Sequence, residues 1–269
     1  MQTAPLNNIR IHILIVSLFL PLMLIGCATV YNQATGRNEY VFVDKDKEIA
    51  IGKEVENAVL KEYTLSKNPI LIARTKKIGE KISRVSDRAD MPYKFGVVES
   101  EDVNAFALPG GGVYVTTALL KEVSSDDELA SVIGHEVGHT SARHQAKRLE
   151  SQLGYSFLVN LAYALDARSV EAKNAAWEDI SAATNITFSL ISLGYSRRDE
   201  MAADRLGALY AKRAGYDPYA AVTFLKKLEK KEKNAPGWLA FVRSHPYAKE
   251  RVSALEEWLS LEDHKDEQM

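Results

Sequence analysis

The stretch VIGHEVGHTSARH places His135 and His139 four residues apart, with Glu136 directly after the first histidine. On a helix this spacing is close to one turn, so both imidazoles can point at a single metal ion. Glu136 would lie about 100° around the helix from His135, which keeps it out of the ligand set but within reach of a metal-bound water. The spacing predicts a metal site with its own general base. Two surface histidines beside a glutamate remain the alternative until a third ligand is found.

The surrounding sequence predicts a helix for this stretch. Ser125 and Glu128 have the spacing of a capping box at a helix start, with acidic residues in the first turn. Gly134 and Gly138 each cost a helix about 1 kcal/mol relative to alanine. Because that cost needs a reason, the two glycines indicate that another backbone or a ligand comes close to this helix.

His144 is a candidate third ligand that the sequence argues against. The extended metzincin pattern would require a glycine at Ala142 and a histidine at Gln145, and neither is present. A helix that continues through this region would also direct His144 well away from the face of the two histidines. We therefore expect His144 on the surface or behind the site.

A second segment, YSRRDEMAADRLGALYAKRAGYDP, supplies better candidates. Ser196 and Asp199 can cap a helix on which Glu200 and Asp204 lie one turn apart. Glu200 could give zinc a carboxylate oxygen, and Asp204 could accept the outer N–H of a ligand histidine and fix its tautomer. A simpler alternative is that neighbouring arginines only neutralise the acidic pair. A row of small residues would let this helix lie close against the histidine helix: Ala203, Gly207 and Ala211. Taken together, the two segments favour the metal site.

The rest of the chain supplies the elements that must position these residues. Apolar residues at helical spacing predict helices in DKDKEIAIGKEVENAVLKEY and PILIARTKKIGEKISRVSD, and from Ser124 nearly to the C-terminus. The β-branched and aromatic stretches YKFGVVES and NAFALPGGGVYVTTALL predict a small sheet with a hairpin turn at PGGG. The predicted fold class is mainly α with a small antiparallel β-sheet (α+β).

The N-terminal region has the pattern of a targeting segment. Arg10 precedes IHILIVSLFLPLMLIGCATV, whose apolar part is short for a membrane span and is broken by Pro21, as in a signal peptide. LIGC resembles the lipobox of bacterial lipoproteins, and Cys27, the only cysteine, stands where the lipid is attached. A plain secretory signal or an uncleaved anchor is the alternative. In enterobacterial lipoproteins an aspartate after the cysteine retains the protein at the inner membrane. Ala28 stands there instead, so we expect an outer-membrane lipoprotein facing the periplasm.

These patterns divide the chain into four parts. We predict a lipoprotein signal peptide (1–26), a lipid-anchored tether (27–43), one catalytic-size domain (44–261) and a polar C-terminal tail (262–269). Residues 152–193 are apolar but interrupted by charges, so we expect no membrane span there and suggest a mobile helical flap over the cleft. The net charge of -2 and the lack of a basic stripe interleaved with aromatics argue against a nucleic-acid partner.

HEVGH, followed some sixty residues later by EMAAD, resembles the gluzincin zinc metallopeptidases of the HtpX and CAAX prenyl protease lineage. NAFALPGG resembles the Asn-Ala-aromatic edge strand on which gluzincins hold an extended peptide, and SHPYAKERV matches a C-terminal His-Pro…Arg element. The resemblance covers residues 44–261 and implies a zincin-type metallopeptidase domain. Because no transmembrane helices or helical repeats are expected, the chain resembles the compact bacterial outer-membrane lipoprotein branch that includes LoiP and YcaL.

The resemblance implies a role for each matching residue. One Zn²⁺ would be held by His135, His139 and Glu200, a donor set that favours zinc over other divalent ions, with Asp204 behind them. Glu136 would act as general base and then as general acid.

The other matching residues concern the substrate. The substrate main chain would add as a strand along Asn104, Ala105 and Phe106. Two further residues would lie near the zinc or the developing oxyanion, a capped turn and a surface ion pair being the alternatives: His245 and Arg251.

The implied activity is zinc-dependent endopeptidase cleavage of misfolded or misassembled cell-envelope proteins. The expected partners are polypeptide substrates, and the membrane through the N-terminal lipid. The alternative is a lipid-anchored periplasmic chaperone or assembly factor that binds extended chains without cutting them. An exopeptidase would need a pocket for a free terminus, of which the sequence gives no sign.

Overall fold

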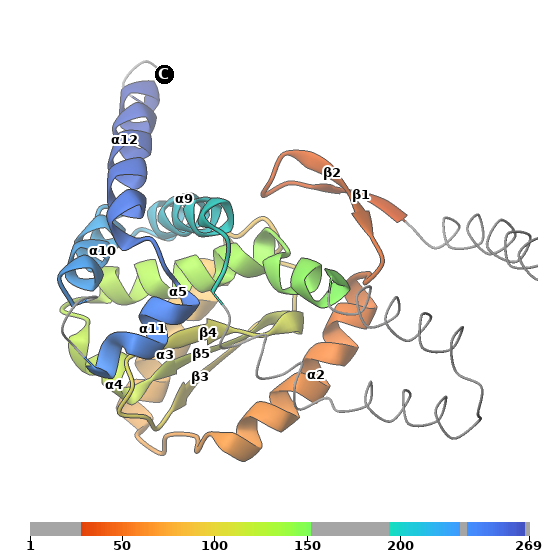
Figure 1. The fold of residues 1–269 in the computed structure, drawn as a ribbon, viewed down its shortest axis with the longest axis horizontal. Helices are drawn as coiled ribbons and strands as arrows, with labels where there is room; N and C mark the ends of the chain where they lie inside the picture. Colours follow the sequence, from red (N-terminus) through yellow and green to blue (C-terminus); the bar gives the residue numbers. More distant parts are fainter. Residues whose placement is uncertain (1–27, 152–193, 232–235, 267–269) are drawn as a thin grey trace, which may run out of the picture.

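The structure is a computed structural model, and it describes residues 28–151, 194–231 and 236–266 (Figure 1). The strands and 3-10 helices are β1 (Ala28–Asn32), β2 (Arg37–Val41), β3 (Lys94–Val98), β4 (Ala105–Ala107), η1 (Pro109–Gly111), β5 (Gly112–Thr116) and η2 (Pro236–Trp238). The α-helices are α2 (Lys45–Glu62), α3 (Pro69–Arg84), α4 (Thr117–Glu122), α5 (Asp126–Ser141), α9 (Arg197–Arg213), α10 (Ala220–Lys231), α11 (Leu239–Ser244) and α12 (Ala248–Asp266). The fold class is confirmed, because helices dominate and the sheets are small.

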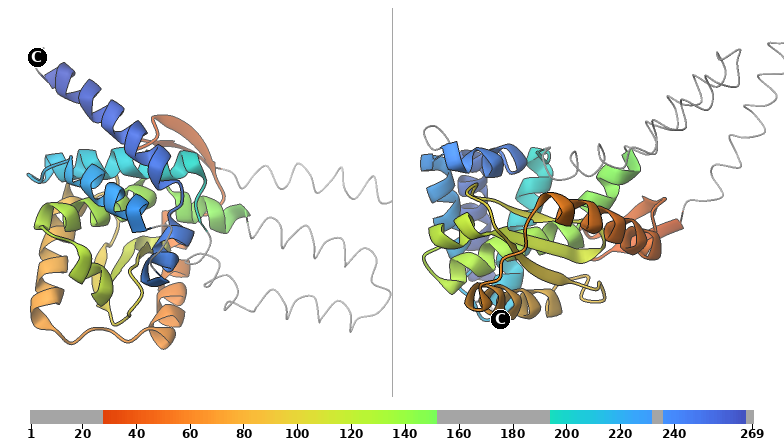
Figure 2. Two further views of the ribbon diagram at one scale, coloured as in Figure 1. Left: turned by 60° about the vertical axis from the view of Figure 1, so that its left-hand side comes forward. Right: turned by 90° about the horizontal axis from the view of Figure 1, so that it is seen from below.

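Helix α5 is the central element of the domain. All but its first two residues are buried, and it packs against α9 on one side and against α3, α10 and strand β4 on others (Figures 1 and 2). A helix buried on all sides cannot show a clean apolar stripe, so α5 carries its polar residues into the interior. Buried polar groups need partners there, which makes α5 the natural place for a site.

The three-stranded sheet has the order β3-β5-β4. Strands β4 and β5 form the predicted hairpin across η1, where Gly110 and Gly111 take φ values of 80° and 97°. Strand β3 pairs with β5 in parallel, so the expectation of a wholly antiparallel sheet is wrong in this detail. Residues 99–111 carry the chain to the far edge and back, and the hairpin turns β5 into the direction of β3.

Residues 28–43, expected to be a tether, contain a folded hairpin. Strands β1 and β2 pair antiparallel, from Ala28 opposite Val41 to Asn32 opposite Arg37. The Glu150 carboxylate accepts hydrogen bonds from the backbone N–H groups of Phe42 and Val43, at 3.1 and 3.0 Å. The hairpin was missed because its attachment to the body relies on polar contacts rather than on an apolar repeat. At the other end, α12 continues to Asp266, into the predicted tail.

The hydrophobic core has two parts. The larger part lies between the sheet and helices α3, α5, α9, α10, α11 and α12. The smaller part lies between α2 and the sheet, where Phe106 contacts Tyr63 and Tyr114 with ring centroids 5.6 Å apart in both pairs. Phe106 is only 3% exposed, so its side chain belongs to this core.

Three predictions concern residues outside the described ranges: the signal peptide, the lipidation of Cys27 and the flap at 152–193. Among the helices that are described, none is long and apolar enough to cross a bilayer.

Candidate metal centre

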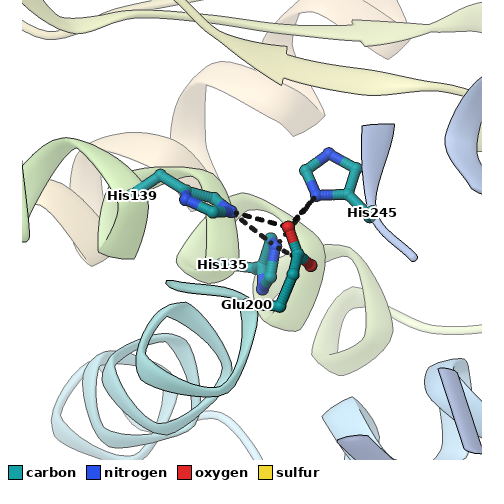
Figure 3. A group of neighbouring side chains, drawn as sticks. All are labelled: His135, His139, Glu200 and His245. Carbon is teal, nitrogen blue, oxygen red and sulfur yellow. Dashed lines mark hydrogen bonds and ion pairs between the residues drawn. The ribbon is translucent and has the colours of Figure 1, made fainter. Parts of the chain in front are cut away.

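Helix α5 begins at the predicted cap and carries the two histidines in its last two turns. The Ser125 hydroxyl accepts the N–H of Glu128 at 3.1 Å, and the Glu128 carboxylate accepts the N–H of Ser124 at 2.7 Å. The imidazoles of His135 and His139 project to the same side, with their Nε2 atoms 3.0 Å apart (Figure 3). Both side chains are buried, which excludes two independent surface histidines.

Helix α9 brings Glu200 to the same point. Ser196 caps this helix as predicted, because its hydroxyl accepts the N–H of Asp199 at 3.2 Å. The Glu200 carboxylate is fully buried, with Oε1 3.5 Å from His139 Nε2 and Oε2 3.5 Å from His135 Nε2. The structure therefore brings together the three predicted ligands from two helices that are sixty residues apart in the chain.

The small residues of α5 and α9 allow this approach. A Cβ atom added at Gly134 would lie 2.8 Å from the carbonyl oxygen of Gly207, and one at Gly138 would lie 2.8 Å from that of Ala203. A Cβ added at Gly207 would lie 2.7 Å from the backbone nitrogen of His135. The two helices are thus in backbone contact, which explains the two mid-helix glycines that the sequence analysis singled out.

A fourth side chain, His245, completes the cluster. His245 follows α11, and its Nδ1 lies 3.2 Å from both His135 Nε2 and Glu200 Oε1. The nearest donor atoms of His135, His139, Glu200 and His245 all lie within 4.8 Å of one another. The prediction placed His245 near the metal, and the geometry allows it to be a ligand. It is not the cap of an exposed turn, because only 2% of it is exposed.

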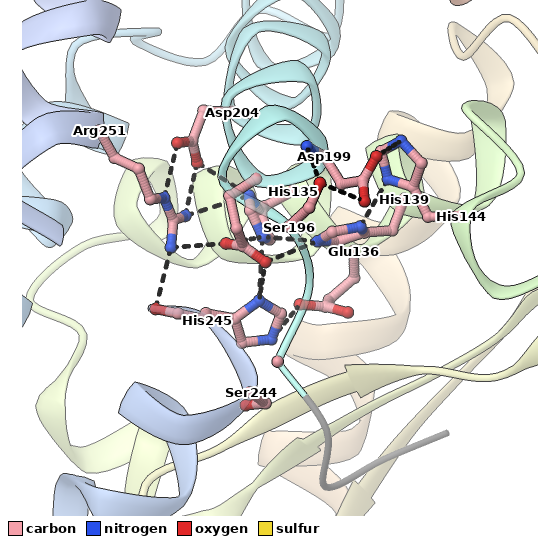
Figure 4. A network of polar contacts seen from close by, with 12 residues as sticks. His135, Glu136, His139, His144, Ser196, Asp199, Asp204, Ser244, His245 and Arg251 are labelled. Atoms are coloured by element: carbon pink, nitrogen blue, oxygen red, sulfur yellow. Dashed lines mark hydrogen bonds and ion pairs between the residues drawn. The ribbon is translucent and has the colours of Figure 1, made fainter. Parts of the chain in front are cut away.

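Asp204 and Arg251 lie behind His135 (Figure 4) and hold it and the Glu200 carboxylate in place. His135 Nδ1 donates to Asp204 Oδ1 at 2.9 Å, so its Nε2 lone pair faces the cluster. Arg251 donates to both Asp204 oxygens, at 2.8 and 2.7 Å, and its Nη1 lies 2.7 Å from Glu200 Oε2. Arg251 is only 2% exposed, so it is not a surface ion pair, and its contacts hold Asp204 and Glu200 in place.

His144 holds the second histidine in the same way. Its Nδ1 lies 2.8 Å from His139 Nδ1, and its Nε2 lies 3.4 Å from Asp199 Oδ1. If His139 donates here, its Nε2 lone pair also faces the cluster. His144 therefore lies behind the site, but not on a continuous helix, because α5 ends at Ser141 and Arg143 takes a φ of 61°. That turn brings His144 back against the helix end, and no sequence pattern announces it.

Tyr195 is a further residue that the sequence analysis missed. Its ring stacks on the His139 ring with centroids 3.9 Å apart, and the Cζ atom of the Arg148 guanidinium lies 4.1 Å from the centroid of the Tyr195 ring. Its backbone N–H donates to the carbonyl of Ser244, directly before His245. Tyr195 therefore fixes the plane of one imidazole and the position of the loop that carries the other. The only signal in the sequence is its place just before the Ser196 cap.

Glu136 faces the cluster from the side opposite to Arg251 (Figure 4). Its carboxylate is 1% exposed, and Oε1 makes no hydrogen bond with the described residues, although His245 Nε2 lies 3.3 Å away. A buried carboxylate oxygen without a hydrogen bond is costly, so this atom is suited to accept a proton or a water O–H.

The pKa shifts leave two of the three imidazoles neutral and keep the Glu200 carboxylate charged. Burial lowers the pKa of His139 well below its usual value and that of His144 to about 4, so both are neutral at pH 7. Burial acts the same way on His135, but hydrogen bonds to Asp204 and Glu200 raise its pKa to about 9. Burial alone would raise the pKa of Glu200, yet the nearby Arg251 holds it well below its usual range.

The cluster has the chemistry of a cation site. Imidazole nitrogens and one carboxylate converge, and Glu200 Oε2 makes no hydrogen bond of good geometry despite its closeness to Arg251. Within the described residues, the carboxylates of Glu136, Glu200 and Asp204 face one buried guanidinium, that of Arg251. A divalent cation would offset this excess of negative charge and displace the proton from His135. The residues fit a metal ion.

Strand β4 lies at the edge of the sheet, beside α5. Asn104 pairs with Thr116 of β5, so by alternation Ala105 and Ala107 direct their backbone groups to the outer edge. The Asn104 side chain accepts the N–H of Ala105 and a hydroxyl hydrogen bond from Ser244, the residue before His245. Asn104 is therefore a link between the edge strand and the metal cluster.

Comparison with known proteins agrees with this geometry. A family model described as peptidase family M48 matches residues 72–259, a range that contains all four residues of the cluster. The chain belongs to peptidase family M48. With the cluster of His135, His139, Glu200 and His245, membership of this family makes the protein a metalloprotease.

Several known proteins are similar to this chain over more than half of its length. The mitochondrial metalloendopeptidase OMA1 of Schizosaccharomyces pombe is 30% identical over 235 residues, which cover 85% of this chain and 66% of the relative. OMA1 of Arabidopsis thaliana is 37% identical over 159 residues, covering 59% and 30%. The β-barrel assembly-enhancing protease of Escherichia coli is 28% identical over 193 residues, covering 70% and 39%. The chain thus spans between 30% and 66% of the length of these relatives.

Proposed function

We propose that this protein is a zinc-dependent endopeptidase that cleaves misfolded or misassembled proteins of the cell envelope. The observation that carries the proposal is the convergence of His135, His139 and Glu200 within one buried cluster, with the unbonded Oε1 of Glu136 beside it. A purely structural ion pair would not leave a carboxylate oxygen in this state. A metal site with an adjacent base is what peptide hydrolysis needs.

The residues would divide the work as follows. His135, His139 and Glu200 would hold the ion, which when bound would supply Lewis acidity to the scissile carbonyl and lower the pKa of water. Glu136 would accept the proton of the attacking water and deliver it to the leaving amine nitrogen. Asp204 would keep the His135 tautomer that leaves Nε2 free as a ligand.

His245 has a position that this chemistry must account for. Catalytic zinc sites keep one coordination position for water or substrate, whereas four protein ligands close the site. Because His245 Nδ1 lies at the cluster, we propose that it withdraws from that position when substrate enters. In the structure its Nε2 lies 3.3 Å from Glu136 Oε1, so it is also close to the proposed base.

The outer edge of β4 would hold the substrate as an added strand. Ala105 and Ala107 offer backbone hydrogen-bonding groups, and such pairing reads main chain more than side chains. Phe106 would not bind the added strand directly, because its ring is in the core and its backbone groups face Tyr114 of β5. Loose sequence specificity follows, which suits a protease of unfolded segments.

An envelope location rests on two observations. The E. coli relative is named as a protease that enhances β-barrel assembly, and the LIGC motif at Cys27 resembles a lipobox. We therefore propose an outer-membrane lipoprotein whose metalloprotease domain faces the periplasm, with envelope polypeptides as substrates.

The Glu136→Gln variant tests the proposed activity. We expect it to retain one zinc ion per chain but to cleave casein about 10²–10⁴-fold more slowly, because the proton acceptor is lost while the ligands remain. Metal analysis and a casein-cleavage assay on the same preparations measure both. Glu257→Gln, an exposed residue of α12, is the matched control and should change neither. Unchanged function in Glu136→Gln would instead favour a chaperone that binds chains without cutting them.

A further inference from the structure

The β1–β2 hairpin has its aromatic residues on the outside. Thr29 lies opposite Tyr40 and Tyr31 opposite Asn38, so these four side chains share one face of the hairpin. Phe42 continues that face beyond β2. The exposed fractions are 61% for Tyr31, 76% for Tyr40 and 57% for Phe42. We define these five residues as the aromatic face.

The other face of the hairpin is attached to the body. Val41 and Asn32 are buried there, at 3% and 6% exposed. The Glu39 carboxylate accepts a hydrogen bond from Lys147 at 2.7 Å, and Arg143 donates to the carbonyl of Val43 at 2.7 Å. The usual arrangement is thus reversed, because a carboxylate faces inward and three aromatic rings face outward.

The sequence just before the hairpin indicates what covers the aromatic face. Residues 11–26 contain no Asp, Glu, Lys or Arg, and only Cys27 separates them from the start of β1. One residue of extended chain spans at most about 3.6 Å. With the membrane attachment proposed above, by a lipid on Cys27 or by the apolar run itself, β1 begins within a few ångströms of the bilayer.

We propose that the aromatic face docks on the headgroup–acyl boundary of the membrane from which the chain emerges. Tyrosine rings favour this boundary because they are apolar with one polar end. The aromatic face contains no charged side chain, so docking needs neither anionic lipid nor low salt. The inference does not depend on the proposed protease activity.

Docking has a consequence for the metal centre. The hairpin is hydrogen-bonded to residues 143–150, which directly follow α5 (Figure 1). A docked hairpin would therefore fix the orientation of α5, and of the cluster on it, relative to the bilayer surface. A single lipid or a short flexible tether would leave that orientation free.

A fluorescence-quenching experiment tests the proposal on the full chain. A polarity-sensitive probe is attached to Tyr40→Cys, and the protein is reconstituted into phosphatidylethanolamine and phosphatidylglycerol vesicles with or without brominated acyl chains. We expect brominated lipid to remove about half of the fluorescence, because an interfacial residue lies about 5–10 Å deep. The same probe on Thr223→Cys, an exposed position on α10 far from the hairpin in Figure 1, should be unaffected. Wild-type protein treated with the same probe measures the fluorescence that comes from any free Cys27.

A second pair of variants separates docking from anchoring. Brominated lipid should quench the probe on Asn38→Cys when the rest of the chain is native. It should not quench that probe when Tyr31, Tyr40 and Phe42 are all replaced by serine, although this variant should still remain bound to the vesicles. Ile70→Ser, which removes a 75% exposed apolar side chain on α3, is the matched control and should leave quenching unchanged.

Three outcomes would overturn the proposal. The probe at Tyr40→Cys could be unaffected by brominated lipid. It could be quenched only in vesicles rich in phosphatidylglycerol, which would point to charge. Or the fluorescence of the probe could fall to the same extent in vesicles with and without brominated lipid, and fall further at higher protein density. That result would assign the aromatic face to a second copy of this chain.

Discussion

At the scale of single residues, the cluster is organised by two chains of polar contacts that end on its histidines. Arg251 and Asp204 fix His135, and Asp199 and His144 stand in the same relation to His139. Both arrangements direct an Nε2 lone pair to the centre. Imidazoles held in one tautomer bind a metal more tightly, because no proton or ring rotation has to be rearranged first.

Asp204→Asn tests the first of these chains. An asparagine keeps the shape but cannot hold the Nδ1 proton as strongly, and it leaves Arg251 with one carboxylate fewer. We expect zinc affinity to fall by about 10–100-fold, measured by competition with a chelator. Asp217→Asn, at an exposed turn, serves as the control. Equal affinities in wild type and Asp204→Asn would contradict the role assigned to Asp204.

His245→Ala tests the fourth position. Loss of this imidazole removes one of four donors, so metal affinity should fall, but casein cleavage at saturating zinc should be at least as fast as in wild type. The reason is that substrate no longer competes with His245 for the metal. A loss of turnover with normal zinc content would show that His245 acts on the oxyanion instead.

At the scale of elements, the site depends on how closely α5 and α9 approach. Their backbones touch at Gly134, Gly207 and Ala203, and each helix contributes ligands only because the other is so near. A helix pair with ordinary side chains at its contact lies about 8–10 Å apart, axis to axis. Small residues at the crossing are therefore part of the metal site although none of them touches the metal.

Gly207→Ala tests this dependence. The added methyl group would lie 2.7 Å from the backbone nitrogen of His135, and a backbone cannot move aside as a flexible side chain can. We expect a loss of about 1–3 kcal/mol in the free energy of unfolding and a weaker zinc site. Arg205→Ala, exposed on the same helix, should change stability by no more than about 0.5 kcal/mol. Urea denaturation and zinc titration measure both variants, and normal values for Gly207→Ala would refute the close-contact argument.

At the scale of the whole molecule, the cluster joins three distant parts of the chain. Its ligands come from α5, from α9 and from the turn between α11 and α12, so a bound ion would cross-link them. Metal binding to the folded state alone stabilises that state by mass action. Global stability should therefore depend on the metal.

Chelation tests this dependence. Removing zinc should lower the melting temperature, with a loss of about 4 kcal/mol if zinc had been present at a thousand times its dissociation constant. The Glu200→Ala variant, which lacks one ligand, should melt early and respond little to the chelator. Calorimetry on both proteins gives the comparison. An equal shift in the two would mean that the chelator acts elsewhere.

The parts of the site that depend on local geometry could be predicted from the amino-acid sequence. Helical spacing places His135 and His139 together and sets Glu136 aside, and the caps at Ser125 and Ser196 start both helices. The small residues also predicted that the helices would touch. These conclusions hold because a helix has a fixed period, so spacing along the chain fixes direction in space.

The parts of the site that depend on chain reversals and long-range packing could be seen only in the folded protein. The turn at Arg143 brought His144 behind His139, and the loop after α11 placed His245 among the ligands. Packing put Phe106 in the core and Arg251 behind the site, and folded residues 28–41 into a hairpin. Such arrangements follow from contacts between segments far apart in sequence, which no local spacing encodes.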